Sequence, residues 1–352
     1  MRPNMKAAYF HGVGDIRVES QSIPEAGSDE LVIKMKASAI CGTDLRILKF
    51  GHFKIPTGTK RVLGHEIAGE VVQVGRHVSQ FKVGMRVALP PNIGCGSCAM
   101  CRKGYTQLCP TYEAFGISYD GGFQDYVKVP AQAIQRGNVV IIPGHISYEE
   151  AAMVEPFSCA YHSYKALNIK PGDSVVIIGA GPIGACHVLM SQLAGASKII
   201  VADVQDNRLE EMAKLGVDVT VNSAREDLKQ AVLRETDGEG ASVIITACSI
   251  PEIQTLSMEI AATHGRINLF GGMPKGKEIV PLNTNLIHYK ELTVLGTTGS
   301  SINDYCESMA LVASGKLQLL PLATARFNVA EINQAFEYAL SGQGMKTLVV
   351  ED

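Results

Sequence analysis

The sequence lacks an excess of basic residues, an apolar run of membrane-spanning length and any internal repeat. Its 352 residues include 32 Lys and Arg against 35 Asp and Glu, which gives a formal net charge of −3. This balance provides no basic surface of the kind that nucleic-acid binding requires. The opening stretch, Met1–Lys6, contains no apolar signal core, so we expect a cytoplasmic protein without nucleic-acid or membrane partners.

The nine cysteines lack the setting of a disulfide framework. An odd number of cysteines in a chain without an export signal favours metal binding over disulfides. With 352 residues, the chain is longer than a domain built around one hydrophobic core usually is. Its 46% share of hydrophobic residues is ordinary for a globular protein. Two domains are therefore expected.

A dinucleotide-binding pattern lies in the middle of the chain. The β-branched run Val175–Ile178 is typical of a buried parallel strand, and a glycine-rich turn follows it at once. The glycines have G-x-G-x-x-G spacing: Gly179, Gly181 and Gly184. A helix and a second strand, Lys198–Ala202, come next, and that strand ends at Asp203. Strand, turn, helix, strand and acid together indicate a dinucleotide site, although a glycine cluster without a ligand is the alternative.

Each part of this turn has its own physical task. Gly179 allows the tight turn, Gly181 lets the backbone approach a pyrophosphate, and Gly184 lets the helix pack close to the strand. The start of the helix, at Pro182 and Ile183, should direct free N–H groups and the positive end of the helix dipole towards the phosphates. We therefore expect these five residues to bind the cofactor.

Asp203 predicts which cofactor binds. A carboxylate at this position accepts hydrogen bonds from the adenosine ribose hydroxyls of NAD and repels the additional 2′-phosphate of NADP. We therefore predict NAD. Arg208, five residues later, could stack on the adenine or pair locally with Asp206 or Glu211, and the sequence leaves both options open.

The chain before this pattern predicts a β domain. From Met5 to about Pro130 short β-type runs are separated by Gly, Pro and Asp, which favours a barrel or sandwich. The expected strands are Lys6–Phe10, Ile16–Glu19, Glu30–Ala39, Ile67–Val74, Arg86–Leu89 and Gln124–Val129. A helix is expected between Gly42 and Lys49.

The chain after Asp203 alternates between helical and strand patterns, as in a doubly wound α/β domain of about six strands. The expected elements are helices Arg208–Lys214, Asp227–Thr236 and Ile253–Ala262 and strands Val217–Val221, Ser242–Cys248, Arg266–Phe270 and Glu291–Leu295. Cys248 and Thr297 should lie at the carboxyl edge of the sheet, where the nicotinamide would bind. The tail, ending in a strand at Lys346–Val350, is expected to fold back onto the first domain.

Four cysteines give the strongest metal signal. They have the spacing C-x2-C-x2-C-x7-C: Cys95, Cys98, Cys101 and Cys109. Four thiolates close a tetrahedral site without an open position, which suits a structural zinc. The run also resembles bacterial ferredoxin motifs, which end in Cys-Pro, but their last gap has three residues. We therefore predict zinc and a colourless protein.

A second set of possible ligands lies at predicted strand ends. Cys41, His65 and Glu66 offer a thiolate, an imidazole and a carboxylate, which form a plausible zinc shell. A buried free cysteine and a core histidine are the alternative. Glu155 favours the metal, because an unpaired acid after the apolar run Ala151–Val154 would be costly without a cation.

As a set, these motifs resemble the zinc-containing medium-chain dehydrogenases, closest to the sorbitol (iditol) dehydrogenase branch. The matching segments occur in the family's order: Cys41-Gly42-Thr43-Asp44, Gly64-His65-Glu66, the four cysteines, Glu155-Pro156 and Gly179–Gly184. The resemblance implies an α/β protein in which a Rossmann doubly wound parallel sheet is inserted in a GroES-like β-barrel catalytic domain. The barrel would comprise residues 1–156 and 299–352, with a structural zinc lobe at about 91–113, and the NAD-binding domain residues 157–298.

The resemblance also assigns roles to residues. Cys41 and His65 match catalytic zinc ligands, Glu66 and Glu155 match acids at the same metal, and Thr43 matches the hydroxyl residue that passes the substrate proton outward. It implies NAD, two zinc ions per subunit and a homodimer or homotetramer. The implied reaction oxidises a secondary alcohol of a polyol or sugar alcohol to a ketone, with hydride transfer to NAD. Polyol-phosphate dehydrogenase and L-threonine 3-dehydrogenase-like activities are alternatives, and an NAD-binding sensor without chemistry is another.

Three positions depart from the sorbitol dehydrogenase pattern. Thr298-Gly299 stands where an Arg-Tyr pair is found, and Ile47 replaces a tyrosine that lines the pocket. Arg46 replaces a histidine that relays protons in many relatives, and an arginine does not titrate there. Arg46 could bind an anionic group such as a phosphate or pair at the surface with Asp44.

Overall fold

The computed structural model describes residues 4–351 and divides into two compact units. One unit joins the chain up to Ser158 to the chain from Ser300 onward, and the other is Cys159–Gly299. The expected domain ranges include residues 1–3 and 352, and the opening stretch includes residues 1–3. These four residues lie outside the described residues. The expected boundaries at 156/157 and 298/299 lie close to these divisions.

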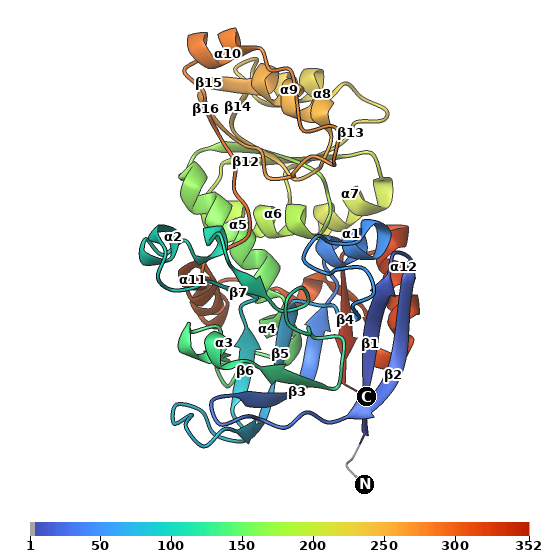
Figure 1. Cartoon of the computed structure of the whole chain (residues 1–352). Helices are drawn as coiled ribbons and strands as arrows, with labels where there is room; N and C mark the ends of the chain where they lie inside the picture. Colours follow the sequence, from blue (N-terminus) through green and yellow to red (C-terminus); the bar gives the residue numbers. More distant parts are fainter. Residues whose placement is uncertain (1–3, 352) are drawn as a thin grey trace. The chain divides into compact units, whose positions relative to one another are not determined.

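The first unit is built mainly of β-strands (Figure 1). Its strands are β1 (Asn4–Gly12), β2 (Asp15–Ser22), β3 (Leu31–Ala39), β4 (Arg61–Val62), β5 (Glu66–Val74), β6 (Arg86–Leu89), β7 (Asn92–Ile93), β8 (Glu113–Ala114), β9 (Tyr126–Val129), β10 (Val140–Ile141), β17 (Ala323–Phe327) and β18 (Lys346–Val350). They form a three-stranded sheet, β2-β1-β4, a two-stranded sheet, β7-β8, and a seven-stranded sheet, β10-β6-β5-β3-β18-β17, in which β9 also pairs with β3. All six strands expected before Pro130 are confirmed.

Helices cover and connect these sheets. They are α1 (Gly42–Phe50), α2 (Ala99–Arg102), α3 (Ala131–Gln135), α4 (Tyr148–Ala152), α11 (Ile302–Ala313) and α12 (Ile332–Ser341), with short 3-10 turns η1 (Thr106–Leu108), η2 (Leu320–Leu322) and η3 (Val329–Glu331). Helix α4 packs on β3 and β5, and α12 packs on β17 and β18. Most of β3 is therefore buried, with Lys34 and Lys36 as its two partly exposed residues.

The C-terminal strand completes the large sheet. Strand β18 pairs antiparallel with β3, with Leu348 opposite Ala39, and parallel with β17. On the other side of β3, Ala39 stands opposite Glu66 of β5. Strands β18 and β5, the strand that carries Glu66, are thus separated by β3 alone. This confirms the prediction that the tail folds back onto the first domain.

The second unit contains one parallel sheet of six strands, as predicted (Figure 1). Its strands are β11 (Ser174–Ile178), β12 (Lys198–Asp203), β13 (Val219–Asn222), β14 (Ala241–Thr246), β15 (Ala261–Asn268) and β16 (Thr293–Leu295), in the order β13-β12-β11-β14-β15-β16. Every neighbouring pair is parallel. The order reverses between β11 and β14, and ligands of such sheets bind at this switch point.

Five helices accompany this sheet, and α5 leads into it. They are α6 (Pro182–Leu193), α7 (Asp206–Lys214), α8 (Leu228–Glu235), α9 (Pro251–Ile260) and α10 (Thr284–Tyr289). The division between the units falls within α5 (Val154–Leu167). Helix α10 was not predicted. The helix expected to reach Ala262 ends at Ile260, because the next residues already form β15.

Candidate active site

The buried carboxylate of Asp44 holds two of the sequence motifs together. Cys41 precedes the first turn of α1, and its backbone N–H donates to Asp44 Oδ2 at 2.9 Å. The backbone N–H of Gly64 donates to Asp44 Oδ1 at 3.1 Å. One side chain therefore fixes Cys41 and the turn before His65 relative to each other, over twenty residues of sequence.

Gly64 sets the direction in which the chain enters His65. Its φ is +89°, in the region that favours glycine. A Cβ at this position would stand 2.8 Å from the ring of Phe123. Neither the backbone conformation nor the space therefore suits another residue here.

Cys41, His65 and Glu66 meet at one point. One ligand atom from each, sulfur, ring nitrogen or carboxylate oxygen, lies within 4.8 Å of the others. Glu66 is fully buried, and its Oε1 accepts a hydrogen bond from Lys346 Nζ at 2.5 Å. Its Oε2 is buried without a hydrogen-bond partner among the described residues. An orphaned carboxylate oxygen beside a thiol and an imidazole fits a divalent cation such as zinc.

The pKa values of His65 and Glu66 are shifted by burial and by neighbouring charges. Burial opposes protonation of His65, but the negative charges of Asp44 and Cys41 raise its pKa well above the usual value. His65 Nδ1 lies 3.6 Å from Asp44 Oδ1. Burial raises the pKa of Glu66 to about 7, against the opposing charge of Lys346. A cation bound between these groups would favour the ionised carboxylate and the neutral imidazole.

The other residues predicted for this site are placed as follows. Glu155 is buried at the start of α5, and its charge raises the pKa of Glu66, but it lies outside the three-residue cluster. Its role as a ligand stays a prediction. Thr43 lies half-buried in the first turn of α1. Ile47, which stands where the sorbitol dehydrogenase branch has a tyrosine, lies in the hydrophobic core, 1% exposed.

The suggested surface pair between Arg46 and Asp44 is wrong. Asp44 is fully buried and its two oxygens accept the backbone N–H groups described above, whereas Arg46 is exposed. The sequence could not show this, because a residue that caps a helix and a residue that forms a surface ion pair are both polar and both lie near a helix start.

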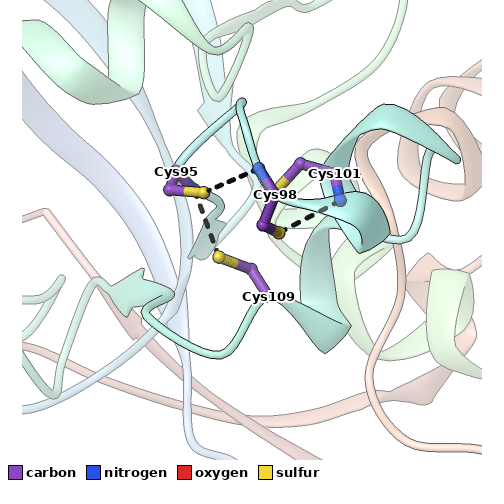
Figure 2. Close-up of side chains that lie close together, drawn as sticks. All are labelled: Cys95, Cys98, Cys101 and Cys109. Atoms are coloured by element: carbon purple, nitrogen blue, oxygen red, sulfur yellow. Dashed lines mark hydrogen bonds between the residues drawn. The ribbon is translucent and has the colours of Figure 1, made fainter.

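The four remaining metal-binding candidates, Cys95, Cys98, Cys101 and Cys109, form a second cluster (Figure 2). Their sulfur atoms all lie within 4.8 Å of one another. Three sulfurs accept backbone N–H groups, from Cys98, Cys101 and Cys95, at 3.3–3.4 Å. The hydrogen bond from the backbone of Ser97, with others, lowers the pKa of Cys95 to about 5. Such donors stabilise thiolates, so the lobe fits a tetrahedral zinc.

We expect Cys98→Ser to remove one metal ion per chain and to lower the melting temperature by roughly 5–15 °C, since each kcal/mol shifts Tm by about 2–4 °C in a domain of this size. Three thiolates and a hydroxyl hold zinc more weakly than four thiolates. Elemental analysis and calorimetry measure both effects, with Cys306→Ser, an exposed cysteine on α11, as the control. A brown protein containing iron would contradict the assignment of zinc.

The glycine-rich turn connects β11 to α6 at the switch point of the sheet. Gly179 has a φ of +116°, and a Cβ on Gly184 would stand 2.0 Å from the carbonyl oxygen of Gly179. Helix α6 therefore packs closely on the end of β11 and begins at Pro182 and Ile183. This is the close approach that a pyrophosphate needs in order to reach backbone N–H groups, so the turn fits a dinucleotide.

Asp203 closes the other side of this turn. Its Oδ2 accepts the N–H of Ala180 at 2.7 Å, and its Oδ1 accepts those of Val204 and Gln205 at 2.7 and 3.1 Å. The carboxylate is thus held in a fixed position at the end of β12, beside Ala180 of the glycine-rich turn. It retains lone pairs that ribose hydroxyls can use.

Arg208 lies over the glycine-rich turn. Its Nη1 is 2.9 Å from the point where a Cβ on Gly181 would stand, and its Nε donates to Gln205 at 3.2 Å. The local pairs suggested by the sequence are wrong. Asp206 pairs instead with Arg225, and Glu211 pairs with Lys214.

Cys248 and Thr297 follow β14 and β16, at the carboxyl edge of the sheet. Burial, together with the charge of Asp203, raises the pKa of Cys248 to about 11. Thr297 Oγ1 accepts a hydrogen bond from Asn268 Nδ2 at 2.8 Å, and the same amide group donates to Ser163 at 2.5 Å. Asn268 was not predicted as a site residue. The sequence feature that could have indicated it is a polar amide at the otherwise apolar end of β15.

Two protein families match the chain. The alcohol dehydrogenase GroES-like domain matches residues 27–144, and the zinc-binding dehydrogenase family matches residues 182–314. The chain therefore belongs to the zinc-dependent medium-chain dehydrogenases. The predicted fold class, a Rossmann sheet inserted in a GroES-like domain, is confirmed.

The similar proteins include dehydrogenases of two substrate classes. A sorbitol dehydrogenase of Bacillus subtilis is 34% identical over 96% of this chain and 94% of its own length. An L-threonine 3-dehydrogenase of Pyrococcus horikoshii is also 34% identical, over 98% of this chain and 97% of its own. The solved structure of a zinc-binding dehydrogenase from Sinorhizobium meliloti, bound to NADP, is 32% identical with a TM-score of 0.91, and the match covers 99% of this chain and 100% of that one.

These similarities show an oxidoreductase of the alcohol and polyol dehydrogenase family, which uses zinc and a nicotinamide dinucleotide. The alternative of a sensor without chemistry is thereby set aside. They do not single out one substrate, because the sorbitol and threonine dehydrogenases are equally similar. Among residues 4–351, no helix combines the length and apolar character that a membrane crossing requires.

Proposed function

We propose that this protein oxidises a secondary alcohol of a polyol or sugar alcohol to a ketone, with NAD as the hydride acceptor. The observation that carries the proposal is the cluster of Cys41, His65 and Glu66, with its orphaned carboxylate oxygen. A thiolate, an imidazole and a carboxylate give three protein ligands of mixed type, which is typical of catalytic zinc sites that keep a further position open. The same chain carries a glycine-rich turn and acid suited to a dinucleotide.

The proposed roles follow from the geometry. Cys41, His65 and Glu66 would hold zinc, and zinc bound there supplies a Lewis acid that lowers the pKa of an alcohol hydroxyl. Asp44 orients Cys41 and His65 through the hydrogen bonds of their backbone segment. Thr43, two residues after Cys41, would take the hydroxyl proton and pass it outward. Glu155 would add a second acidic group beside Glu66.

The residues of the second unit would position the cofactor, which itself carries the hydride chemistry. Gly181 and the first residues of α6, Pro182 and Ile183, would bind the pyrophosphate. Asp203 would bind the adenosine ribose, with Arg208 beside it. Cys248 and Thr297 would border the nicotinamide at the carboxyl edge of the sheet.

A substrate panel tests the proposed activity. Zinc-loaded protein is assayed with neutral polyols, polyol phosphates and L-threonine, and NADH formation is followed by absorbance. We expect turnover of polyols. L-Threonine is the second candidate, because the threonine dehydrogenase is as similar to this chain as the sorbitol dehydrogenase. Absence of turnover with every alcohol would contradict the proposal.

We expect NAD to be preferred over NADP, and Asp203→Asn to reduce that preference about tenfold or more, since a hydrogen bond to a charged group contributes about 1.5–3 kcal/mol. The amide keeps one acceptor but no longer repels a 2′-phosphate. The ratio of kcat/KM for the two cofactors measures this, with Asp206→Asn, exposed and paired with Arg225, as the control. Wild-type protein that prefers NADP, the cofactor bound in the Sinorhizobium structure, would refute the assignment.

Two further properties follow from the family resemblance. We propose a homodimer or homotetramer, which sedimentation or light scattering of the purified protein decides. We also propose a cytoplasmic, reducing location. Cys41 and the four cysteines of the second cluster form no disulfide, and they need reduced thiols to bind metal.

A further inference from the structure

The segment between Asp44 and Glu66 has an unusual charge distribution. It contains five basic residues and no acid: Arg46, Lys49, Lys54, Lys60 and Arg61. The chain as a whole carries a net charge of −3, so this local excess is not a reflection of overall composition. Its first cation, Arg46, lies about one helical turn after Thr43, which is proposed to act on the substrate hydroxyl.

Three of these five cations are already compensated. Lys60 pairs with Glu19 at 2.7 Å, and Arg61 pairs with Asp120 at 2.9 Å. Lys54 donates to the carbonyl of Tyr112 and lies 3.7 Å from the centre of its ring. Their charges serve to hold the loop after α1 onto the β domain.

Arg46 is different, because its guanidinium has no hydrogen-bond or ion-pair partner among residues 4–351. Asp44, the nearest acid in the sequence, is buried and fully engaged with backbone N–H groups. Helix α1 turns Asp44 and Ile47 into the core. Thr43 and Arg46, three residues apart, are neighbours on the surface of the same helix.

His52, in the loop after α1, offers a second donor. Its Nδ1 accepts the N–H of Lys54 at 3.1 Å, so the proton of the neutral ring resides on Nε2. Burial, and next the charge of Arg46, lowers the pKa of His52, which keeps the ring neutral near pH 7. The guanidinium is a bidentate donor suited to an oxyanion, and the Nε2–H of His52 is a further available donor.

We propose that Arg46, assisted by His52, binds an anionic group of the substrate, a phosphate or a carboxylate, while the hydroxyl to be oxidised lies near Thr43. This inference rests on the proposed function and narrows its substrate class from polyols to polyols or hydroxy compounds that carry an oxyanion. Arg46 is then a specificity residue: it binds the end of the substrate that does not react.

The test compares Arg46→Gln with the wild type on matched substrates: a neutral polyol, the phosphate ester of the same polyol, and L-threonine. We expect the wild type to favour one of the anionic substrates. Arg46→Gln should reduce the ratio of anionic to neutral kcat/KM by about 10–100-fold, the usual effect of losing a hydrogen bond to a charged group. Arg46→Lys, which keeps the charge but loses the planar fork, should give an intermediate ratio.

Lys49→Gln is the matched control, because Lys49 is an exposed cation on the same helix. It should leave the ratio unchanged. The phosphate ester and L-threonine arms distinguish a phosphate-binding from a carboxylate-binding role. An equal loss of the ratio in Lys49→Gln and Arg46→Gln would reduce the effect to general surface charge and overturn the inference.

The inference and the proposed function fail in different ways. Turnover of neutral polyols with no advantage for either anion would overturn the inference and leave the proposed function standing. If no alcohol is oxidised, the proposed function fails, and calorimetric titration with the polyol phosphate decides the inference alone. Binding that weakens about tenfold or more in Arg46→Gln would support it, because loss of a charge-assisted hydrogen bond has an effect of this size, and equal binding would overturn it.

Discussion

Replacing Cys41 by Ser, or His65 by Ala, is expected to abolish alcohol oxidation, with a loss on the order of 10³-fold or more in kcat, because Lewis-acid catalysis contributes several kcal/mol to transition-state stabilisation. The three candidate ligands lie within 4.8 Å of one another, and two of them do not hold a divalent ion as three do. Binding of NAD should change little, since the glycine-rich turn and Asp203 lie in the other unit.

Three measurements separate catalysis from folding for these variants: steady-state rates, NADH binding by fluorescence and metal content per chain. Zinc should fall from two ions to one, with the four-cysteine lobe still loaded. Cys306→Ser, remote in sequence and exposed, is the matched cysteine control. Variants that lose NADH binding together with turnover would indicate a folding role for the cluster, and variants that keep full activity would exclude it as the catalytic site.

The sequence predicted the parts of the fold that local patterns encode. Alternating β-branched and helical runs predicted the parallel sheet from Val175 onward, because each strand and helix carries its own periodicity. Strands of two residues, such as β4, β7, β8 and β10, were not predicted, since their definition depends on a pairing partner and not on composition. Helix α10 was missed for a related reason: it has six residues, and its two core-packed apolar residues, Leu286 and Ile287, are too few to show a helical period.

In the site, too, local motifs were predictable and contacts between distant residues were not. Motif spacing predicted that Cys41, His65 and Glu66 could share a metal, and the structure brings them together. It did not predict Asp44 as the buried tie between the motifs, nor Asn268 as the partner of Thr297. Lys346 was likewise missed: it lies 280 residues from Glu66, and the two meet only because β18 and β5 flank β3.

Lys346→Met is expected to destabilise the metal-depleted protein increasingly above pH 7, by about 1 kcal/mol at roughly pH 8 since each pH unit contributes about 1.4 kcal/mol, because it leaves a buried carboxylate without its counter-charge. Lys346 Nζ and Glu66 Oε1 are 2.5 Å apart, with side chains 4% and 0% exposed. Burial already raises the pKa of Glu66 to about 7 in the presence of this lysine. Removing the ammonium must raise that pKa further, because the lysine is the group that opposes the effect of burial.

The dependence on pH follows from the direction of this shift. The unfolded state ionises Glu66 near its ordinary value of 4.5, while the folded state retains the proton until the raised pKa. Stability therefore falls as pH rises between the two values and then levels off. In Lys346→Met the fall should continue past pH 7, so the difference from the wild type should be smaller at roughly pH 5 and larger, by about 1 kcal/mol, at roughly pH 8.

Urea unfolding in the presence of a chelator at these two pH values measures the effect, and Glu66→Gln isolates it. Adding Glu66→Gln to Lys346→Met removes the titrating group, so the double variant should lose the dependence of the difference on pH. Zinc should reduce the penalty of Lys346→Met, because a cation at Glu66 Oε2 replaces the missing charge. A penalty of equal size at both pH values would show that Lys346 contributes packing alone and does not hold Glu66 ionised for the metal.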